Sequence, residues 1–326
     1  MNPFVKPSLL FLIVLICSCD SSDDSPKNPS NQTGLIQNQK IQIDGNQREY
    51  HLYLPENANS ESPLVMLLHG NGGSFDQTAG LNNTKSPESA WLQTAEENNF
   101  LVAVPNGSPG ASGRLGWNDC RNDAQGQTGA DHVKFIDELM QKVQSNYGFD
   151  QNRVYVSGIS NGGFMANRLA MEMPEKISAF ASVISSMPEN SECENSTLSV
   201  SALFMNGTAD PVVPYEGGEV INNRGAIFST QKAVNYWTDR NETDAEAVEA
   251  QLPDLNTGDN SNVMKFSYLN GTNNTAVVLY KINNGGHTAP SIDQQYNSIY
   301  LNLVGNQNHD IEMAEEIWAF FEGKTN

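Results

Sequence analysis

A serine between glycines lies in the stretch VYVSGISNGGFMANRLA, residues 154–170. A β-branched run precedes it and a helix-like pattern follows, so Gly158-Ile159-Ser160-Asn161-Gly162 is a G-x-S-x-G turn between a strand and a helix. In such a turn the serine hydroxyl is exposed, and the glycines leave space where a Cβ would collide with a neighbouring element. The pattern predicts that Ser160 is a nucleophile. The alternative is that the glycines only allow the strand and the helix to pack tightly.

A nucleophilic serine needs a base, and the base needs an acid that orients it. Asp210 lies in a tight loop after an apolar run, and His287 follows two glycines after the last expected strand. The chain order Ser, Asp, His is that of α/β-hydrolases, so we predict a triad of Ser160, Asp210 and His287. A turn aspartate before proline is the alternative for Asp210. A helix start explains His309, the other late histidine.

A glycine-rich loop, His69-Gly70-Asn71-Gly72-Gly73, directly follows the apolar run LVMLL. Glycines let the backbone approach a substrate closely, and the loop resembles the oxyanion loops of the HGGG type. We predict one oxyanion-hole donor from the backbone N–H of Asn161 and a second from Asn71. His69 is expected to orient the loop rather than to transfer protons.

The predicted elements place all these residues after strands. Helices are expected at residues 86–98, 131–147, 163–173, 226–237 and 310–323, and strands at 41–55 (an antiparallel hairpin), 64–68, 101–105, 154–157, 180–184, 202–205, 263–268 and 276–282. This alternation predicts an α/β-hydrolase fold, with a mostly parallel central sheet and helices on both faces. Ligands of such sheets bind beyond the carboxyl ends of the strands. The acidic segment 241–262 is expected to be a surface loop, with a lid as the alternative.

The N-terminal residues carry an export signal rather than part of the fold. An apolar run of eight residues, 9–16, follows Lys6 and is too short to span a bilayer. The run ends in Ile16-Cys17-Ser18-Cys19, where a small residue just before a cysteine resembles a bacterial lipobox. This predicts a lipoprotein signal at 1–18 and a lipid anchor on Cys19; the alternative is a plain secretory signal. Residues 19–37 are expected to be a flexible tether and 38–326 the folded domain. We therefore expect an outer-membrane or cell-surface lipoprotein, or a secreted protein.

The charge and the cysteine content of the chain bear on its possible ligands and on a possible disulfide. The net charge of -20 argues against a nucleic-acid partner, since phosphate binding needs a basic face. The five histidines and four cysteines show no metal-ligand spacing, and we expect neither a metal nor a cofactor. Outside the signal, Cys120 and Cys193 remain, and an even pair in an exported protein predicts a disulfide. Two unpaired thiols are the alternative.

Five segments together resemble the polyhydroxybutyrate depolymerase-like esterases, a family that also holds feruloyl esterases and acetylxylan esterases of carbohydrate esterase family one. They are HGNGG, GWNDCR, RVYVSGISNGG, NGTADPVVPYEGG and NGGHTAP, and the resemblance runs from about residue 43 to 321. It implies Ser160 as nucleophile, Asp210 as acid and His287 as base. It also implies a bridge between Cys120 and Cys193.

The resemblance implies an ester substrate but leaves its identity open. Trp117 and Tyr215 lie in loops that the resemblance places near the site, where they would stack on an aromatic acid or a sugar; partly buried packing is the alternative. Ala289 stands where the family usually has tryptophan, which implies a more open rim. We expect a feruloyl or acetyl esterase acting on polysaccharide fragments. The alternatives are an aliphatic polyester depolymerase and, more remotely, a non-catalytic glycan-binding lipoprotein.

Overall fold

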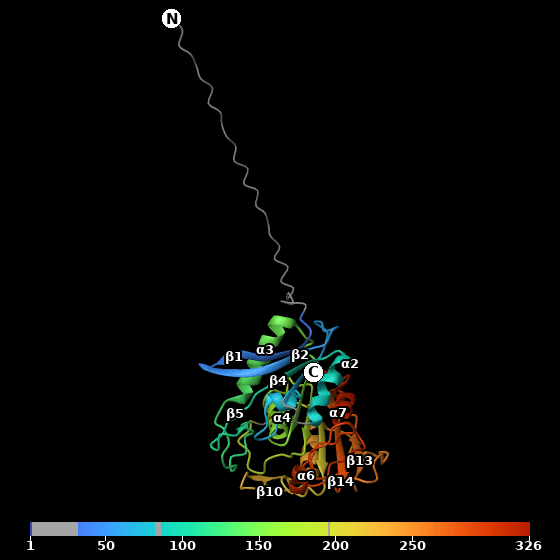
Figure 1. Ribbon diagram of the computed structural model, residues 1–326. Coiled ribbons are helices and arrows are strands. Elements are labelled where there is room, and N and C mark those ends of the chain that lie inside the picture. The colour runs from blue at the N-terminus through green and yellow to red at the C-terminus, as the bar shows by residue number, and fades with distance from the viewer. Residues whose placement is uncertain (2–31, 82–85, 195) are drawn as a thin grey trace.

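Ten strands form one sheet, whose order is β1-β2-β4-β3-β7-β8-β9-β14-β13-β12 (Figure 1). The computed structural model describes residues 1, 32–81, 86–194 and 196–326. Strands β4, β3, β7, β8, β9 and β14 run parallel, and antiparallel strands extend the sheet at both ends. The strands are β1 Gly34–Ile43, β2 Asn46–Leu54, β3 Leu64–Leu68, β4 Leu101–Pro105, β7 Val154–Ile159, β8 Ala179–Val183, β9 Ser201–Gly207, β12 Val248–Gln251, β13 Asn262–Tyr268 and β14 Val277–Asn283.

Helices cover both faces of this sheet because the central strands are apolar on both sides. One core packs α3, α4 and α5 against residues such as Met66 and Val156, and the other packs α2 and α7 against their chain neighbours such as Val65 and Tyr155. The helices are α1 Phe75–Thr78, η1 Pro87–Ser89, α2 Ala90–Asn98, α3 His132–Tyr147, α4 Asn161–Glu172, α5 Thr230–Asn241, η2 Thr272–Asn274, α6 Ser298–Val304 and α7 Met313–Phe321. The predicted α/β-hydrolase architecture is confirmed.

Two small hairpins lie outside the main sheet. Strand β5, Ser108–Pro109, pairs with β6, Leu115–Gly116, and β10, Gly218–Glu219, pairs with β11, Ala226–Ile227. The second pair corrects the expected helix at 226–237, which begins only at Thr230. Ser229 caps that helix, since its hydroxyl accepts a hydrogen bond from the N–H of Lys232.

The segment 241–262 is not a loop throughout, because β12 forms an edge strand within it. Its four residues are all exposed, so no buried face marked them as a strand in the sequence. Further along, the N–H groups of Leu255 and Asn256 donate to the carboxylate of Asp310. Asp310 therefore holds a loop instead of starting the last helix, which begins at Met313.

The boundary of the predicted tether also moves. Strand β1 begins at Gly34, which pairs with Leu54, and Ile36 is buried, so residues 34–37 belong to the sheet. Apart from Met1, the predicted signal at 1–18 lies outside the described residues, as do Cys19 and the tether up to residue 31. Within the described part of the chain, no helix is both long and apolar enough to cross a membrane.

Candidate active site

Ser160 occupies a strained turn between β7 and α4. Its φ of 53° and ψ of -120° lie outside the regions that non-glycine residues usually adopt. A Cβ on Gly158 would collide with the carbonyl oxygen of Gly162, and a Cβ on Gly162 would collide with that of Leu68. The glycines therefore let the helix start pack directly on the ends of β7 and β3, with the serine between them.

Ser160, His287 and Asp210 form one hydrogen-bonded chain. Nε2 of His287 lies 3.0 Å from Oγ of Ser160, and its Nδ1 lies 2.7 Å from Oδ2 of Asp210. Asp210 and His287 are 9% and 6% exposed, so the pair is largely shielded from water. In this geometry Nδ1 donates to the carboxylate and Nε2 is free to accept the serine proton.

The loop after β9 orients Asp210. Its other oxygen, Oδ1, accepts hydrogen bonds from the N–H groups of Val212 and Val213 at 2.7 and 2.8 Å. These donors fix the carboxylate plane, so Oδ2 faces His287. The turn that follows the aspartate therefore holds the carboxylate in place, in keeping with the predicted role of Asp210 rather than with the alternative of an ordinary turn before proline.

His69 holds the loop after β3. Its Nε2 accepts a hydrogen bond from the N–H of Gly107 at 2.9 Å, so Nδ1 carries the proton and donates to the carbonyl oxygen of Gly70 at 2.8 Å. Burial lowers the pKa of His69 to about 4. A neutral ring locked between two backbone groups orients the loop, as expected from the sequence.

The two predicted oxyanion donors both border cavities that open at Ser160. Within residues 32–81, 86–194 and 196–326, the backbone N–H groups of Asn71 and Asn161 donate to no other group. The Gly70 backbone comes close to the nucleophile, since a Cβ built on Gly70 would lie 3.6 Å from that of Ser160. The two N–H groups are therefore available to an oxygen at the serine.

A buried polar platform supports Asn161. Its side chain accepts from the N–H of Trp117 at 2.7 Å and donates to Oδ2 of Asp119 at 2.6 Å, and Arg121 pairs with that carboxylate through two nitrogens. Asp119 and Arg121 were not among the predicted site residues. They belong to the segment GWNDCR, but only the folded chain brings that segment, more than 40 residues before Asn161, to its side chain.

The proposed stacking role of Trp117 is wrong. The side chain is 1% exposed, and its indole N–H donates to the carbonyl oxygen of His69 at 2.8 Å. Trp117 borders the second cavity, but its side chain is almost wholly buried, so the ring is not available for stacking on a ligand. Tyr215 is half-buried and lines neither cavity at Ser160; its ring lies 5.8 Å from the ammonium of Lys281. Ala289 is fully buried, so its small side chain does not open the rim.

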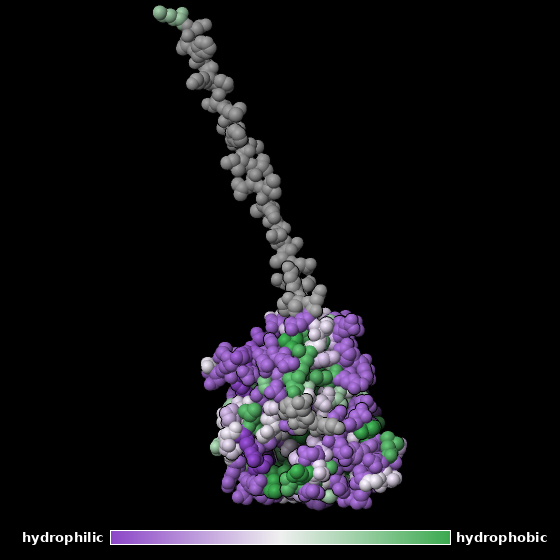
Figure 2. Space-filling model, in the orientation of Figure 1, coloured by the Kyte–Doolittle hydropathy of each residue, from purple (hydrophilic) through white to green (hydrophobic). Residues whose placement is uncertain are grey.

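Two cavities meet at Ser160. The first, of about 880 Å³, is lined by the His69–Gly73 loop, His287 and residues of the 295–301 segment, including Tyr296 and Tyr300. Figure 2 shows a hollow on the side where α6 lies, with hydrophobic residues at its edge. The second, of about 430 Å³, is lined by Phe164 and Val213 and by three arginines. No residue of the segment 241–262 lines either cavity, so the structure does not make that segment a lid.

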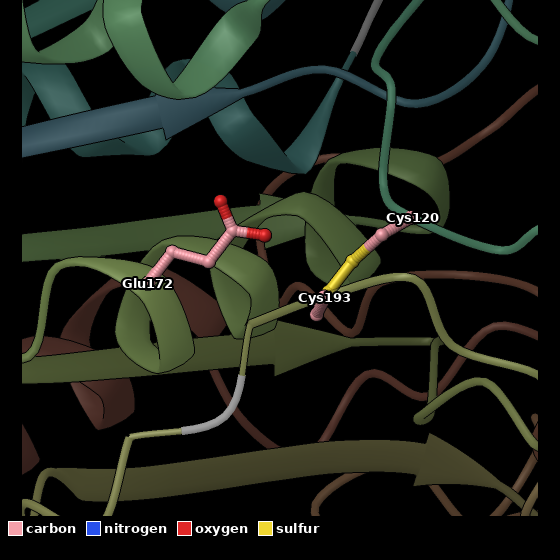
Figure 3. Close-up of side chains that lie close together, drawn as sticks. All are labelled: Cys120, Glu172 and Cys193. Carbon is pink, nitrogen blue, oxygen red and sulfur yellow. A yellow bond between two sulfur atoms is a disulfide. The ribbon is translucent and has the colours of Figure 1, made fainter.

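The predicted disulfide between Cys120 and Cys193 is confirmed (Figure 3). It joins the loop that carries Asp119 and Arg121 to the chain after β8, across a separation of 73 residues. The carboxylate of Glu172 lies near the bridge, within 4.8 Å of the sulfur atoms. Because the two sulfurs are bonded to each other, they are not available as thiolate ligands for a metal ion.

A known protein family matches the part of the chain that holds Ser160 and Asp210. The model of the Esterase family, described as "Putative esterase", matches residues 42–261. This chain belongs to the Esterase family. The match includes Ser160, Asp210 and the platform under Asn161, and it ends before His287.

Relatives of this esterase-family chain include "Probable feruloyl esterase C" of Aspergillus flavus, which is 30% identical over 184 residues. That alignment covers 56% of this chain and 62% of the relative, so the chain spans less than two thirds of the relative's length. A bifunctional acetylxylan esterase/xylanase of Neocallimastix patriciarum is 29% identical over 169 residues, which are 52% of this chain and 22% of that protein.

The fold is shared with a solved acetyl xylan esterase from Aspergillus awamori. The two structures superpose with a TM-score of 0.54 at 16% sequence identity, over 88% of this chain and 98% of the other. At this identity the likeness concerns the fold alone.

Proposed function

We propose that this protein is a serine carboxylic-ester hydrolase with Ser160 as nucleophile, His287 as base and Asp210 as the orienting acid. The observation that carries the proposal is the hydrogen-bonded chain of these three side chains, at 3.0 and 2.7 Å, at the junction of two cavities. Membership of the Esterase family supports the same reaction. A glycan-binding protein without catalysis would have no need to keep this alignment.

The reaction follows from the geometry. Nε2 of His287 takes the proton of Ser160 while Oγ attacks the ester carbonyl carbon, which gives a tetrahedral intermediate. Nε2 then returns the proton to the leaving alkoxide, and the alcohol departs from the acyl-enzyme. Water attacks the acyl-enzyme by the same route and releases the acid. Asp210 stabilises the imidazolium in each half without taking its proton.

The negative oxygen of each tetrahedral intermediate needs donors that are already in place. We assign this role to the N–H groups of Asn71 and Asn161, because both are unpartnered within the described residues and face cavities at Ser160. A preorganised donor of this kind typically contributes a factor of about 10²–10³ to kcat. The platform of Asp119 and Arg121 keeps the Asn161 side chain away from the oxyanion and fixes the helix start.

For the substrate we propose a feruloyl or acetyl ester of a saccharide fragment. The relatives named above support both acyl groups by their names. In the first cavity the rings of Tyr296 and Tyr300 lie 5.0 Å apart, and amide and hydroxyl side chains such as Gln77 and Ser298 line the same space. Aromatic rings beside hydrogen-bonding groups suit an aromatic acid or a sugar. An aliphatic polyester is the second candidate, retained from the sequence resemblance.

We further propose that the protein is exported and anchored through lipid on Cys19. This rests on the apolar run at 9–16 and the cysteine that follows it. Cys19 lies outside the residues that the structure describes, so the anchor rests on the sequence alone. Metabolic labelling with a palmitate analogue, compared between the natural chain and Cys19→Ala, tests the anchor; equal labelling of both would reject it.

The function is tested by measuring kcat/KM for methyl ferulate and p-nitrophenyl acetate, with Ser160→Ala as the blank. Cleavage of ferulate that is lost in the variant supports both the nucleophile and an aromatic acyl site. Cleavage of acetate alone keeps the triad and moves the substrate to acetylated glycans or polyesters. If neither ester is cleaved faster than in Ser160→Ala, and a fluorophosphonate does not label Ser160, the hydrolase proposal fails.

A further inference from the structure

The second cavity at Ser160 gathers positive charge in a strongly acidic protein. The chain carries 38 acidic and 18 basic side chains, of which seven are arginines. Three of the seven, Arg114, Arg121 and Arg224, line this cavity, and none of its described lining residues is aspartate or glutamate. A cleft lined by one sign of charge concentrates ligands of the opposite sign.

Among the described residues, a carboxylate pairs with one of the three guanidinium groups, that of Arg121. Arg121 pairs with Asp119 through Nε and Nη2 at 3.1 and 2.7 Å. Arg114 and Arg224 have no carboxylate within 4.0 Å and no side-chain hydrogen bond to any described residue. Their guanidinium donors are therefore available to a ligand.

The carboxylates beside the Arg224 loop are engaged elsewhere. Asp123 accepts from the Asn190 amide and the N–H of Ala226, and Glu219 accepts from the N–H of Gly225. These contacts shape the loop but leave the charge of Arg224 unmatched. Burial, and then the positive charges of Arg121 and Arg114, lower the pKa of Arg224, so an anion in the cavity would relieve an unfavourable arrangement.

The cationic cavity is also coupled to the reaction centre. Nη1 of Arg121 donates to the carbonyl oxygen of Arg224 at 2.8 Å, while the Asp119 carboxylate that Arg121 binds also accepts from Asn161. The backbone of Arg224 is thus connected through Arg121 and Asp119 to Asn161, the residue next to the nucleophile. Ser160 itself lines the same cavity.

We propose that the second cavity binds a carboxylate of the substrate, so that the preferred ester is one that carries a carboxylate, as an acylated uronic-acid saccharide does. The proposal rests on the proposed ester hydrolysis and adds the charge of the substrate. Arg114 and Arg224 bind the carboxylate, because a planar guanidinium matches its two oxygens. The ester bond is placed at Ser160 while the charged group lies in the cavity.

Two matched ester pairs test this with the full-length protein. The first pair, p-nitrophenyl butyrate and the p-nitrophenyl monoester of glutaric acid, adds the carboxylate to the acyl half. The second pair, the acetate esters of methyl glucoside and methyl glucuronoside, adds it to the alcohol half. We expect kcat/KM to be about tenfold higher for the charged member of one pair, corresponding to a charge-assisted hydrogen bond.

Variants separate recognition from catalysis. Arg224→Gln and Arg114→Gln are expected to remove most of this preference, measured as the ratio of kcat/KM for the charged and the neutral member of the responsive pair. Lys142→Gln is the matched control, because Lys142 is also an unpaired cation within the described residues but lines neither cavity. Should Arg224→Gln fold poorly, Arg114→Gln and a salt series on the natural protein give the answer, since salt screens only the charged substrate.

The outcomes are distinct. A charged-ester preference that falls with salt and in the arginine variants supports the proposal, and the responsive pair identifies the half that carries the carboxylate. Cleavage of the neutral esters with no preference in either pair overturns it and leaves the hydrolase function standing. Absence of cleavage of all four esters above Ser160→Ala removes the proposed function and this inference with it.

Discussion

The two cavities at Ser160 share a nucleophile but differ in charge and surface. The first is larger, bears two tyrosines and the Glu88 carboxyl, and has no lysine or arginine among its described lining residues. Burial raises the pKa of Glu88, which favours its neutral form. The second bears three arginines and no described acidic residue. Under the proposed function and the proposed carboxylate site, one reaction centre serves two separate binding surfaces, so the acyl and alcohol halves of an ester meet different chemical environments.

Asp210→Asn should reduce kcat equally for neutral and for charged esters. The new amide would turn its carbonyl oxygen toward the Val212 and Val213 N–H groups and its NH₂ toward Nδ1 of His287, which forces the proton onto Nε2. A histidine in that tautomer cannot accept the proton of Ser160, and we expect kcat to fall about 10⁴-fold. Steady-state kinetics on neutral and charged esters should show the same loss for both. Unequal losses would show that Asp210 also acts in recognition.

Acid should destabilise the loop that His69 holds, which borders both cavities through Asn71. The pKa of His69 is about 4 in the folded protein and near 6.5 when unfolded, so the unfolded chain binds more protons between these values. Stability is therefore full above about pH 6.5 and falls as pH drops toward 4, by about 3 kcal/mol from this group. Buried His132, with a pKa of about 3, adds to the same trend.

Urea unfolding at pH 7 and pH 5 measures this dependence. His69→Gln removes the titrating group, so its free energy of unfolding should vary less with pH than that of the natural protein. Identical pH slopes in the two proteins would contradict the assigned role of His69. Activity on both ester types, measured at pH 7, shows whether the Gly70 loop keeps its position.

Asn161→Ala should reduce kcat/KM by different factors for neutral and for carboxylate-bearing esters. The backbone N–H remains, but the buried Asp119 carboxylate and the Trp117 N–H each lose a partner. We expect kcat/KM to fall about tenfold on neutral esters and further on carboxylate-bearing ones, because Arg121 and the Arg224 loop depend on the same platform. Steady-state kinetics on the matched pairs checks this. An equal fall in kcat/KM for both members of a pair would show that the platform does not contribute to binding in the cationic cavity.

The sequence identified what is determined locally. The G-x-S-x-G turn depends on contacts between adjacent elements, so the position of Ser160 followed from the motif. Asp210 and His287 were found in a different way, from their order in the chain and from their loops after expected strands. The parallel strands were recognisable because they are apolar throughout. The burial of Trp117 was not, since it depends on His69 and Asn161, both more than 40 residues away.

Other features lacked any local signal. Arg114, Arg121 and Arg224 are spread over more than 100 residues, and only the folded chain shows that they face one cavity and which of them is paired. Residues 226–229 were expected to be helical, but Ala226 and Ile227 pair with β10 as β11, and Ser229 caps the helix that follows. The exposed strand β12 carries no apolar alternation to reveal it.

Because of the disulfide, the redox conditions under which the protein is produced should affect its preference between charged and neutral esters. Cys120 directly follows Asp119 and precedes Arg121, so the Cys193 bridge fastens the arginine platform, whereas the triad loops contain no cysteine. Protein produced in a reducing host should therefore cleave neutral esters more slowly, because the same platform supports Asn161, and its preference for charged esters should decline as well. Assays of oxidised and dithiothreitol-treated samples on the matched esters would reveal this, and an unchanged ratio would refute it. An activity screen with neutral chromogenic esters alone would therefore miss the loss of preference for charged substrates.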